Sequence, residues 1–283
     1  MKAGTVSILG CGWMGLPLGK NLLEKGFLVK GSVTDPEKFE TLLNSGIAPY
    51  QIVLSDTEVA LDDSSFFETD VLIISIPPRR IAGIERIFPA QIAQLIPLIL
   101  KSEIRKVIFI SSTSVYPENL QSANENDVFS PDKESGKACL SAENLLKNLT
   151  DFETTVIRFG GLIGADRNPA RFLLRSVRPV ANIPVNLIHQ DDCIGIITAI
   201  LQKDLWGETL NACCPEHPMK KDFYEKAARI SGVAAPFISD QTEAYKIVDS
   251  SKLKRLLKYK FKYPSPMDYL DSLITSKKSK GEK

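Results

Sequence analysis

Short apolar runs alternate with amphipathic stretches through the first 160 residues of the chain. The runs are rich in Val, Ile and Leu, whereas the stretches between them repeat apolar residues at helical spacing. The apolar runs occupy residues 5–9, 27–33, 50–54, 71–76, 106–111 and 154–159. The helical patterns occupy residues 13–25, 36–45, 90–101 and 133–149. This alternation predicts βαβ units with parallel strands, because such strands are covered on both faces and read as nearly continuous apolar runs.

The alternation loosens after residue 160, where prolines divide the chain into short pieces. They are Pro169, Pro179, Pro184, Pro215, Pro218, Pro236, Pro264 and Pro266. We therefore predict an α/β protein with a Rossmann-type doubly wound parallel sheet, formed as a dinucleotide-binding domain over residues 1–160. Residues 161–283 are expected to form a smaller, irregular C-terminal substrate lobe, of which residues 186–212 return to the Rossmann core.

Charge and composition narrow the class of protein. The 283 residues are 43% hydrophobic and 24% charged, and 35 basic against 34 acidic residues give a net charge of +1. This balance leaves no basic excess for binding phosphate backbones, so no nucleic-acid partner is expected. The longest apolar stretch, residues 87–100, is interrupted by Pro89, Gln91, Gln94 and Pro97, so no membrane partner is expected either. The first residues do not resemble a signal peptide, and we expect a cytoplasmic protein.

The cysteines number five and show no CxxC pairing. They are Cys11, Cys139, Cys193, Cys213 and Cys214. An odd number without paired spacing predicts reduced thiols and no zinc site, and Cys213 and Cys214 are expected to face opposite sides of a strand. The basic tail at residues 276–283 is expected to be disordered.

A glycine-rich turn follows the first predicted strand and opens the first predicted helix. It reads Gly10, Cys11, Gly12, Trp13, Met14, Gly15, which is GxGxxG in its required strand–turn–helix context. The first glycine permits a tight turn, the second lets the backbone approach a pyrophosphate, and the third lets the helix pack on the strand. The helix N-terminus then faces the phosphates. These six residues are therefore predicted to bind NAD or NADP.

The second predicted strand bears on the choice between NAD and NADP. An NAD site usually has Asp or Glu at the end of this strand, where it bonds the ribose 2′-hydroxyl. Here Ser32 and Thr34 stand near that position and could donate hydrogen bonds to a 2′-phosphate, so NADP is favoured over NAD. Asp35 is the counter-argument, since it could be that acidic residue displaced by a turn. Further cofactor contacts are expected from Ser75, Pro77 and Ser111.

Four segments in the right order resemble the extended short-chain dehydrogenase/reductases, the NAD-dependent epimerase/dehydratase family. SSTSVY at residues 111–116 resembles the family's SSxxVYG, and VIRFGGLIG at residues 156–164 resembles the segment lining the nicotinamide. The segments at residues 185–197 and 210–215 resemble the family's IHvdDvA and NvcdP. The resemblance implies a Rossmann fold and a nicotinamide cofactor, and it places Ser112 at the position of the catalytic Ser/Thr.

The family's YxxxK pair is missing. SGKACLSAE at residues 135–143 aligns with the family's YGxSKLxxE, which puts Ser135 at the tyrosine position and Cys139 at the lysine position. A two-residue slide would instead pair Lys133 with Lys137 but still lacks a tyrosine. The resemblance is therefore to the atypical branch of the superfamily, with an altered catalytic tetrad.

Other groups could carry chemistry in place of the missing pair. Lys137 and Glu134 lie on the same predicted helix, whereas His189 is more typical of a structural hydrogen-bonding residue. Arg158, at the end of a strand, could reach a phosphate or pair with a buried carboxylate.

Two functions follow from these motifs. The first is an NAD(P)-dependent oxidoreductase or epimerase acting on a small polar substrate, with a sugar nucleotide as a candidate. The second is a non-catalytic dinucleotide-binding sensor or regulatory protein, which the missing tyrosine and lysine favour. The persistence of Ser112 and of the substrate-lobe motifs favours the enzyme.

Overall fold

The computed structural model describes residues 4–119, 122–127, 130–164, 166–167, 169–171, 180–239 and 243–281. The chain divides into two compact units. The first comprises residues 1–115, 129–158 and 197–210, and the second comprises residues 116–128, 159–196 and 211–283.

An eight-stranded sheet organises the first unit, with the strand order β11-β7-β6-β5-β1-β2-β3-β4. Its strands are β1 (Thr5–Leu9), β2 (Leu28–Val33), β3 (Ala48–Leu54), β4 (Val59–Leu61), β5 (Val71–Ile74), β6 (Lys106–Ser112), β7 (Glu153–Phe159) and β11 (Thr209–Ala212). β1 pairs in parallel with β2 and β5, as do β2 with β3 and β5 with β6. This mixed α/β, mostly parallel sheet confirms the predicted fold class.

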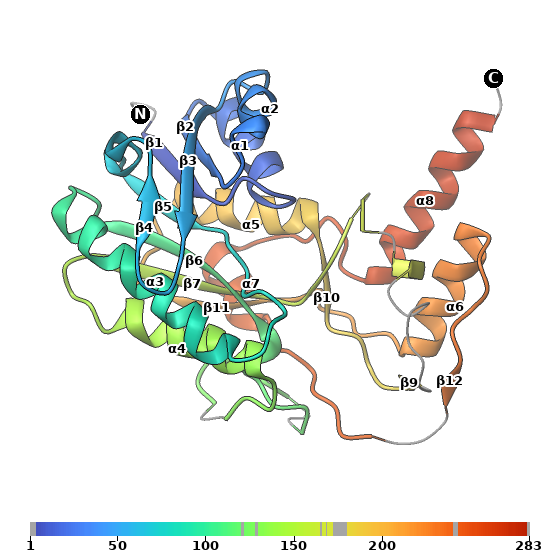
Figure 1. Cartoon of the computed structure of the whole chain (residues 1–283). Coiled ribbons are helices and arrows are strands. Elements are labelled where there is room, and N and C mark those ends of the chain that lie inside the picture. Colours follow the sequence, from blue (N-terminus) through green and yellow to red (C-terminus); the bar gives the residue numbers. More distant parts are fainter. Residues whose placement is uncertain are drawn as a thin grey trace. The chain divides into compact units, whose positions relative to one another are not determined.

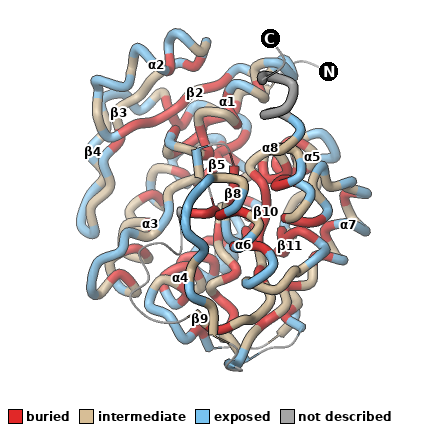
Figure 2. The backbone as a smooth tube through the Cα atoms, turned by 90° about the vertical axis from the view of Figure 1, so that its right-hand side faces the viewer, coloured by how far each residue is buried: buried red, intermediate tan, exposed pale blue. Residues whose placement is uncertain are grey.

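Helices connect these strands in the βαβ manner. They are α1 (Gly15–Glu24), α2 (Phe39–Leu43), α3 (Ile84–Lys101), α4 (Glu134–Lys147) and α5 (Gln190–Lys203), with 3₁₀ helices η1 (Pro36–Lys38), η2 (Ser64–Phe67) and η3 (Thr113–Val115). α3 and α4 lie side by side in Figure 1 and pack against each other. Figure 2 shows β2 largely buried, whereas α2 near the sheet edge is mostly exposed.

Three elements differ from the predicted ones. α3 begins at Ile84 rather than near residue 90, because Ile84, Phe88 and Ile92 continue one buried face through Pro89. That burial outweighs the hydrogen bond that a proline removes from a helix. The predicted helix at residues 36–45 is split into η1 and α2. β4, an antiparallel partner of β3, was not predicted.

The second unit is built from short elements around its own core. They are β8 (Gly161–Ile163), η4 (Pro169–Arg171), β9 (Val180–Ala181), β10 (Leu187–His189), α6 (Lys220–Ser231), β12 (Ile238–Ser239), α7 (Ser251–Leu257) and α8 (Pro266–Gly281). β8 pairs with β10 and β9 with β12, both in parallel. Phe223, Tyr224 and Leu270 are buried in the core of this unit, apart from the core formed by α3, α4 and the sheet.

Two predictions about the C-terminal part are wrong. Cys213 and Cys214 lie just after β11, which ends at Ala212, so they are not strand residues; both are buried. The tail expected to be disordered continues α8 as far as Gly281, and only residues 282–283 lie outside the described residues. Within the described part of the chain, no helix combines the length and apolar character needed to cross a membrane.

Candidate functional site

Two glycines of the turn between β1 and α1 are required by the backbone itself. Gly10 has φ of +99°, and a Cβ there would lie 2.8 Å from the Ile76 side chain. A Cβ on Gly15 would lie 2.3 Å from the Gly10 carbonyl oxygen. Left-handed backbone disfavours a side chain at Gly10, and steric overlap excludes one at Gly15. These two residues therefore make the tight turn and the close helix–strand packing that the sequence predicted.

Gly12 is different, because nothing in the structure requires it to be a glycine. It is exposed, its φ lies outside the left-handed region, and among the described residues no atom beyond its two chain neighbours lies within 4 Å of the position that a Cβ would take. The first turn of α1 carries no acidic residue, so its N-terminal dipole is not neutralised by a side chain. The turn therefore leaves open space above backbone at a positive helix end, which is a site suited to a phosphate.

The residues between these glycines contact the sheet through their backbone and through buried side chains. Cys11 N–H donates to the Ser32 carbonyl at 2.7 Å, and the Cys11 thiol is buried with its pKa raised to about 12 by burial. Met14 is buried and Trp13 is half-buried. Cys11 can therefore serve a cofactor through its backbone and not through an ionised thiol.

The end of β2 places the residues that bear on NAD or NADP. The Ser32 side chain is buried, and its hydroxyl accepts the Gly10 N–H at 2.9 Å, so it supports the glycine turn. Thr34 is exposed. Asp35 caps η1 by accepting the Glu37 N–H at 3.1 Å, which gives its carboxylate a local partner. Of the predicted ribose-site side chains, Thr34 is the one that solvent reaches freely.

The loop after β5 packs on the glycine turn. Ser75 N–H donates to the Leu9 carbonyl at 2.9 Å, and the Ser75 carbonyl oxygen lies 3.1 Å from the position of a Cβ on Gly10. Pro77 is exposed two residues further on. Both predicted residues therefore follow a strand that pairs directly with β1, at the carboxyl end of the sheet, where open α/β sheets bind their ligands.

β6 ends in two serines that differ in environment. Ser111 is buried, and its hydroxyl donates to Glu143 Oε1 of α4 at 2.5 Å. Ser112 is half-buried, and its Oγ accepts the Ser114 N–H at 3.1 Å. Ser112 thus has the accessible hydroxyl of the pair, whereas Ser111 is committed to an interior contact.

One face of α4 lies against this strand end. Ser135, Cys139 and Glu143 follow each other at four-residue steps and so share a face of the helix. Gly136 fits closely, because a Cβ there would lie 2.1 Å from the Ser114 carbonyl oxygen. Ser135 is half-buried, whereas Cys139 is 2% exposed. Burial, aided by the Glu143 carboxylate, raises the pKa of Cys139 to about 12, which argues against a catalytic thiolate there.

Arg158 and Glu143 form a buried ion pair that sequence reasoning left open. Arg158 Nη2 lies 2.6 Å from Glu143 Oε2, and Arg158 Nε also donates to the carboxylate. The two side chains are 5% and 1% exposed. Glu143 therefore joins α4, β6 and β7 through one carboxylate. The sequence feature that points to Glu143 is its alignment with the final glutamate of the family's YGxSKLxxE motif.

The remaining candidates lie outside this cluster. Lys133 stands at the N-cap of α4, and Glu134 and Lys137 are exposed on that helix. In the second unit, His189 is buried and contacts the rings of Tyr263 and Tyr269, with centroids 4.4 and 4.5 Å away. Its Nδ1 accepts the Asp191 N–H, and burial lowers its pKa. These contacts match the structural role expected for His189.

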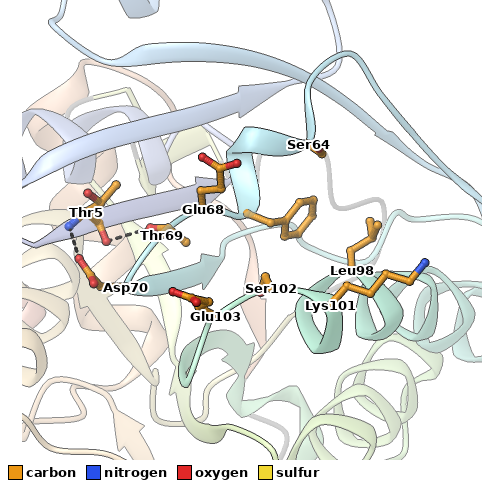
Figure 3. Close-up of a pocket in the computed structure, with 10 residues that line it drawn as sticks. Thr5, Ser64, Glu68, Thr69, Asp70, Leu98, Lys101, Ser102 and Glu103 are labelled. Atoms are coloured by element: carbon orange, nitrogen blue, oxygen red, sulfur yellow. Dashed lines mark hydrogen bonds between the residues drawn. The ribbon is translucent and has the colours of Figure 1, made fainter.

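A cavity of about 640 Å³ opens at the amino-terminal end of the strands. Thr5 at the start of β1, Asp70 just before β5 and Glu103 just before β6 lie around it, as Figure 3 shows. Asp70 accepts the Thr5 N–H. The cavity is thus at the opposite end of the strands from the glycine turn, and it is not the predicted cofactor site.

Comparison with known proteins places the chain in a family. It is 32% identical over 266 residues to protein YeeZ of Escherichia coli (strain K12), covering 93% of this chain and 97% of that protein. No model of a known protein family matches the chain.

Two solved structures share the fold at low identity. A short-chain dehydrogenase/reductase superfamily protein from Agrobacterium tumefaciens with bound NAD has a TM-score of 0.75, 15% identity and 98% coverage of both chains. UDP-glucuronic acid 4-epimerase from Bacillus cereus, in complex with UDP-glucuronic acid and NAD, has a TM-score of 0.73 and 20% identity, covering 94% of this chain and 96% of that one. The chain therefore belongs to the family of YeeZ and has the fold of the extended short-chain dehydrogenase/reductases and NAD-dependent epimerases.

Proposed function

We propose that this protein binds NAD or NADP, with the pyrophosphate over Gly12 and against the backbone of residues 11–14. The observation that carries the proposal is the open space at Gly12, because neither its φ nor any neighbour explains the absence of a side chain. The bound nicotinamide cofactors of the two structural neighbours support it. The cofactor would supply hydride transfer, and the chain supplies its position and its electrostatic surroundings.

The reaction we propose is that of an oxidoreductase or epimerase acting on a small polar substrate, with a sugar nucleotide as the candidate. Ser112 is the proposed substrate-binding hydroxyl, since it is the accessible serine at the end of β6. Ser135 lies on the α4 face that packs against this strand end and is the proposed second polar contact. UDP-glucuronic acid in the Bacillus cereus neighbour supports the substrate class.

A non-catalytic dinucleotide sensor is the second candidate, and the burial of Cys139 favours it. The α4 face that carries Ser135 offers neither a phenol nor an ammonium group in the family register. General acid–base groups typically contribute about a hundredfold to ten-thousandfold in rate, so a protein without them turns over slowly. Ser112→Ala separates the two candidates. An enzyme should lose turnover in this variant, whereas a sensor keeps its cofactor affinity and has no turnover to lose.

The experiment for the cofactor site is Gly12→Val, with NAD and NADP binding measured by calorimetry. A Cβ at residue 12 would meet open space, and the Val side chain would occupy the proposed pyrophosphate position, so we expect binding to be lost while the fold persists. Far-UV circular dichroism and thermal unfolding establish that the variant is folded. Wild-type affinity in folded Gly12→Val would place the phosphate site elsewhere.

A further inference from the structure

Two adjacent arginines, Arg79 and Arg80, follow β5 in the loop that leads to α3. Both are exposed. Among the residues that the structure describes, neither has an ion-pair partner, whereas Arg86 pairs with Glu85 and Arg158 with Glu143. Their two positive charges are therefore not neutralised by a neighbouring carboxylate.

The loop places these arginines close to the cofactor turn. Ser75 and Ile76, at its start, lie next to Gly10, because their atoms are 3.1 and 2.8 Å from the position of a Cβ on that glycine. Pro77 and Pro78 come next, and proline fixes φ near −65°, which limits the conformations open to this part of the loop. The arginines thus begin three residues after Ile76, at the carboxyl end of the sheet.

The strand order tells which flank of the turn the arginines occupy. β5 and β2 pair with β1 on opposite sides. Thr34, at the proposed adenosine ribose, follows β2, whereas Arg79 and Arg80 follow β5. The arginines therefore lie on the flank away from the 2′-position of that ribose, so a 2′-phosphate of NADP is not the group they are placed to meet.

We propose that Arg79 and Arg80 form an anion subsite for a phosphate-bearing substrate, which deepens the proposed function by naming a substrate class and rests on its placement of the cofactor. Guanidinium groups bind phosphate through paired hydrogen bonds. A phosphate monoester carries about 1.5 to 2 negative charges at neutral pH, so it matches two adjacent cations better than a single carboxylate does.

The test uses inorganic pyrophosphate as the probe and the full-length Gly12→Val protein, in which the Val side chain blocks the glycine turn. Calorimetry should detect millimolar or tighter binding in this background. Adding Arg79→Gln and Arg80→Gln should weaken binding about tenfold to a hundredfold, the range for losing charge-assisted hydrogen bonds. Adding Arg86→Gln instead is the matched control, since Arg86 is 86% exposed within α3 and should leave the affinity unchanged.

Absence of pyrophosphate binding in the Gly12→Val protein, or equal binding with and without the two arginines, would overturn the subsite. NAD titration of otherwise wild-type protein provides the second arm. Arg79→Gln with Arg80→Gln should leave NAD affinity within about twofold, because the pair meets the substrate. A loss of NAD affinity matching the loss for pyrophosphate would assign the arginines to the dinucleotide and overturn the substrate assignment. If wild-type protein binds no NAD while the arginines still bind pyrophosphate, the proposed cofactor function fails and the anion subsite stands.

Discussion

At the residue scale, the three glycines of the turn are glycines for different physical reasons. Gly10 is required by its φ, Gly15 by the nearby Gly10 carbonyl, and Gly12 by neither. We therefore expect Gly10→Ala and Gly15→Ala to lower the free energy of unfolding by at least about 1 kcal/mol, and Gly12→Ala to change it by less than about 0.5 kcal/mol. Urea denaturation measures all three variants. A destabilised Gly12→Ala would mean that packing, and not a ligand, explains this glycine.

Cofactor preference depends on the side chains at the end of β2. Ser32 and Thr34 stand where an NAD site usually has a ribose-binding carboxylate, and the nearby Asp35 uses one carboxylate oxygen to cap η1. We expect NADP to bind more tightly than NAD, and Thr34→Asp to reverse the order by repelling the 2′-phosphate. Calorimetric dissociation constants for both cofactors test this, with Thr41→Asp, exposed on α2, as the control. A tighter constant for NAD in the wild-type protein contradicts the prediction.

Buried thiols make stability depend on pH in the alkaline range. Burial raises the pKa of Cys11, Cys139 and Cys214 to about 12, from a reference of 9.0. The folded state therefore holds protons that the unfolded chain releases, so the free energy of unfolding is undiminished below pH 9 and falls as the pH rises towards 12. Each thiol contributes a slope of at most about 1.4 kcal/mol per pH unit.

Urea unfolding at about pH 8 and about pH 10 measures this slope. Cys139→Ala should make this slope shallower by the contribution of one thiol, whereas Thr41→Ala, which removes no ionisable group, should leave the slope unchanged. A free energy of unfolding that is equal at the two pH values would show that these thiols ionise equally in both states.

At the element scale, one carboxylate joins α4 to two strands of the sheet. The buried Glu143 carboxylate accepts a hydrogen bond from the Ser111 hydroxyl and forms an ion pair with Arg158. Glu143→Gln would leave the Arg158 charge buried without its counter-ion, so we expect a loss of about 3–5 kcal/mol in the free energy of unfolding. Glu134→Gln, exposed in the first turn of the same helix, should change it by less than about 0.5 kcal/mol. Urea denaturation measures the free energy of unfolding of both variants. Equal decreases would mean that the buried ion pair does not stabilise the fold more than an exposed carboxylate does.

Elements with a strong repeating pattern could be predicted from the sequence, and those set by tertiary packing could not. Continuous apolar runs predicted β1, β5 and β6, and the glycine spacing predicted the turn. The early start of α3 was missed because a proline inside a helical pattern usually marks a helix boundary. In the structure the buried face of α3 continues past Pro89. β4 has three residues and no pattern of its own, since its pairing with β3 defines it.

The candidate site follows the same division. The glycine turn could be predicted because the chemistry there lies in consecutive residues. The contact between Ser111 and Glu143 joins residues 32 positions apart, so no local pattern shows it. The burial of Cys139 could not be predicted either, because no local sequence feature distinguishes an accessible helical cysteine from a buried one.

At the scale of the whole molecule, each unit has its own hydrophobic core. Leu270 is 1% exposed in the core of the second unit, so Leu270→Ala should cost about 2–5 kcal/mol in the free energy of unfolding. The glycine turn belongs to the first unit, so cofactor affinity below the unfolding transition should not change. Leu43→Ala, at a residue 59% exposed, is the control for stability. Weaker NAD or NADP binding by folded Leu270→Ala would make the second unit part of the cofactor site.

The burial of every cysteine makes the protein suited to optical distance measurements. All five are free and inaccessible, so a maleimide dye should leave the native chain unlabelled. Thr41→Cys in the first unit, exposed on α2, and Phe237→Cys in the second, where the native ring is 75% exposed, would then be the two sites of attachment. Resonance energy transfer between the two dyes would report the separation of the units in solution, and its change on adding NAD or NADP would show whether the cofactor draws them together.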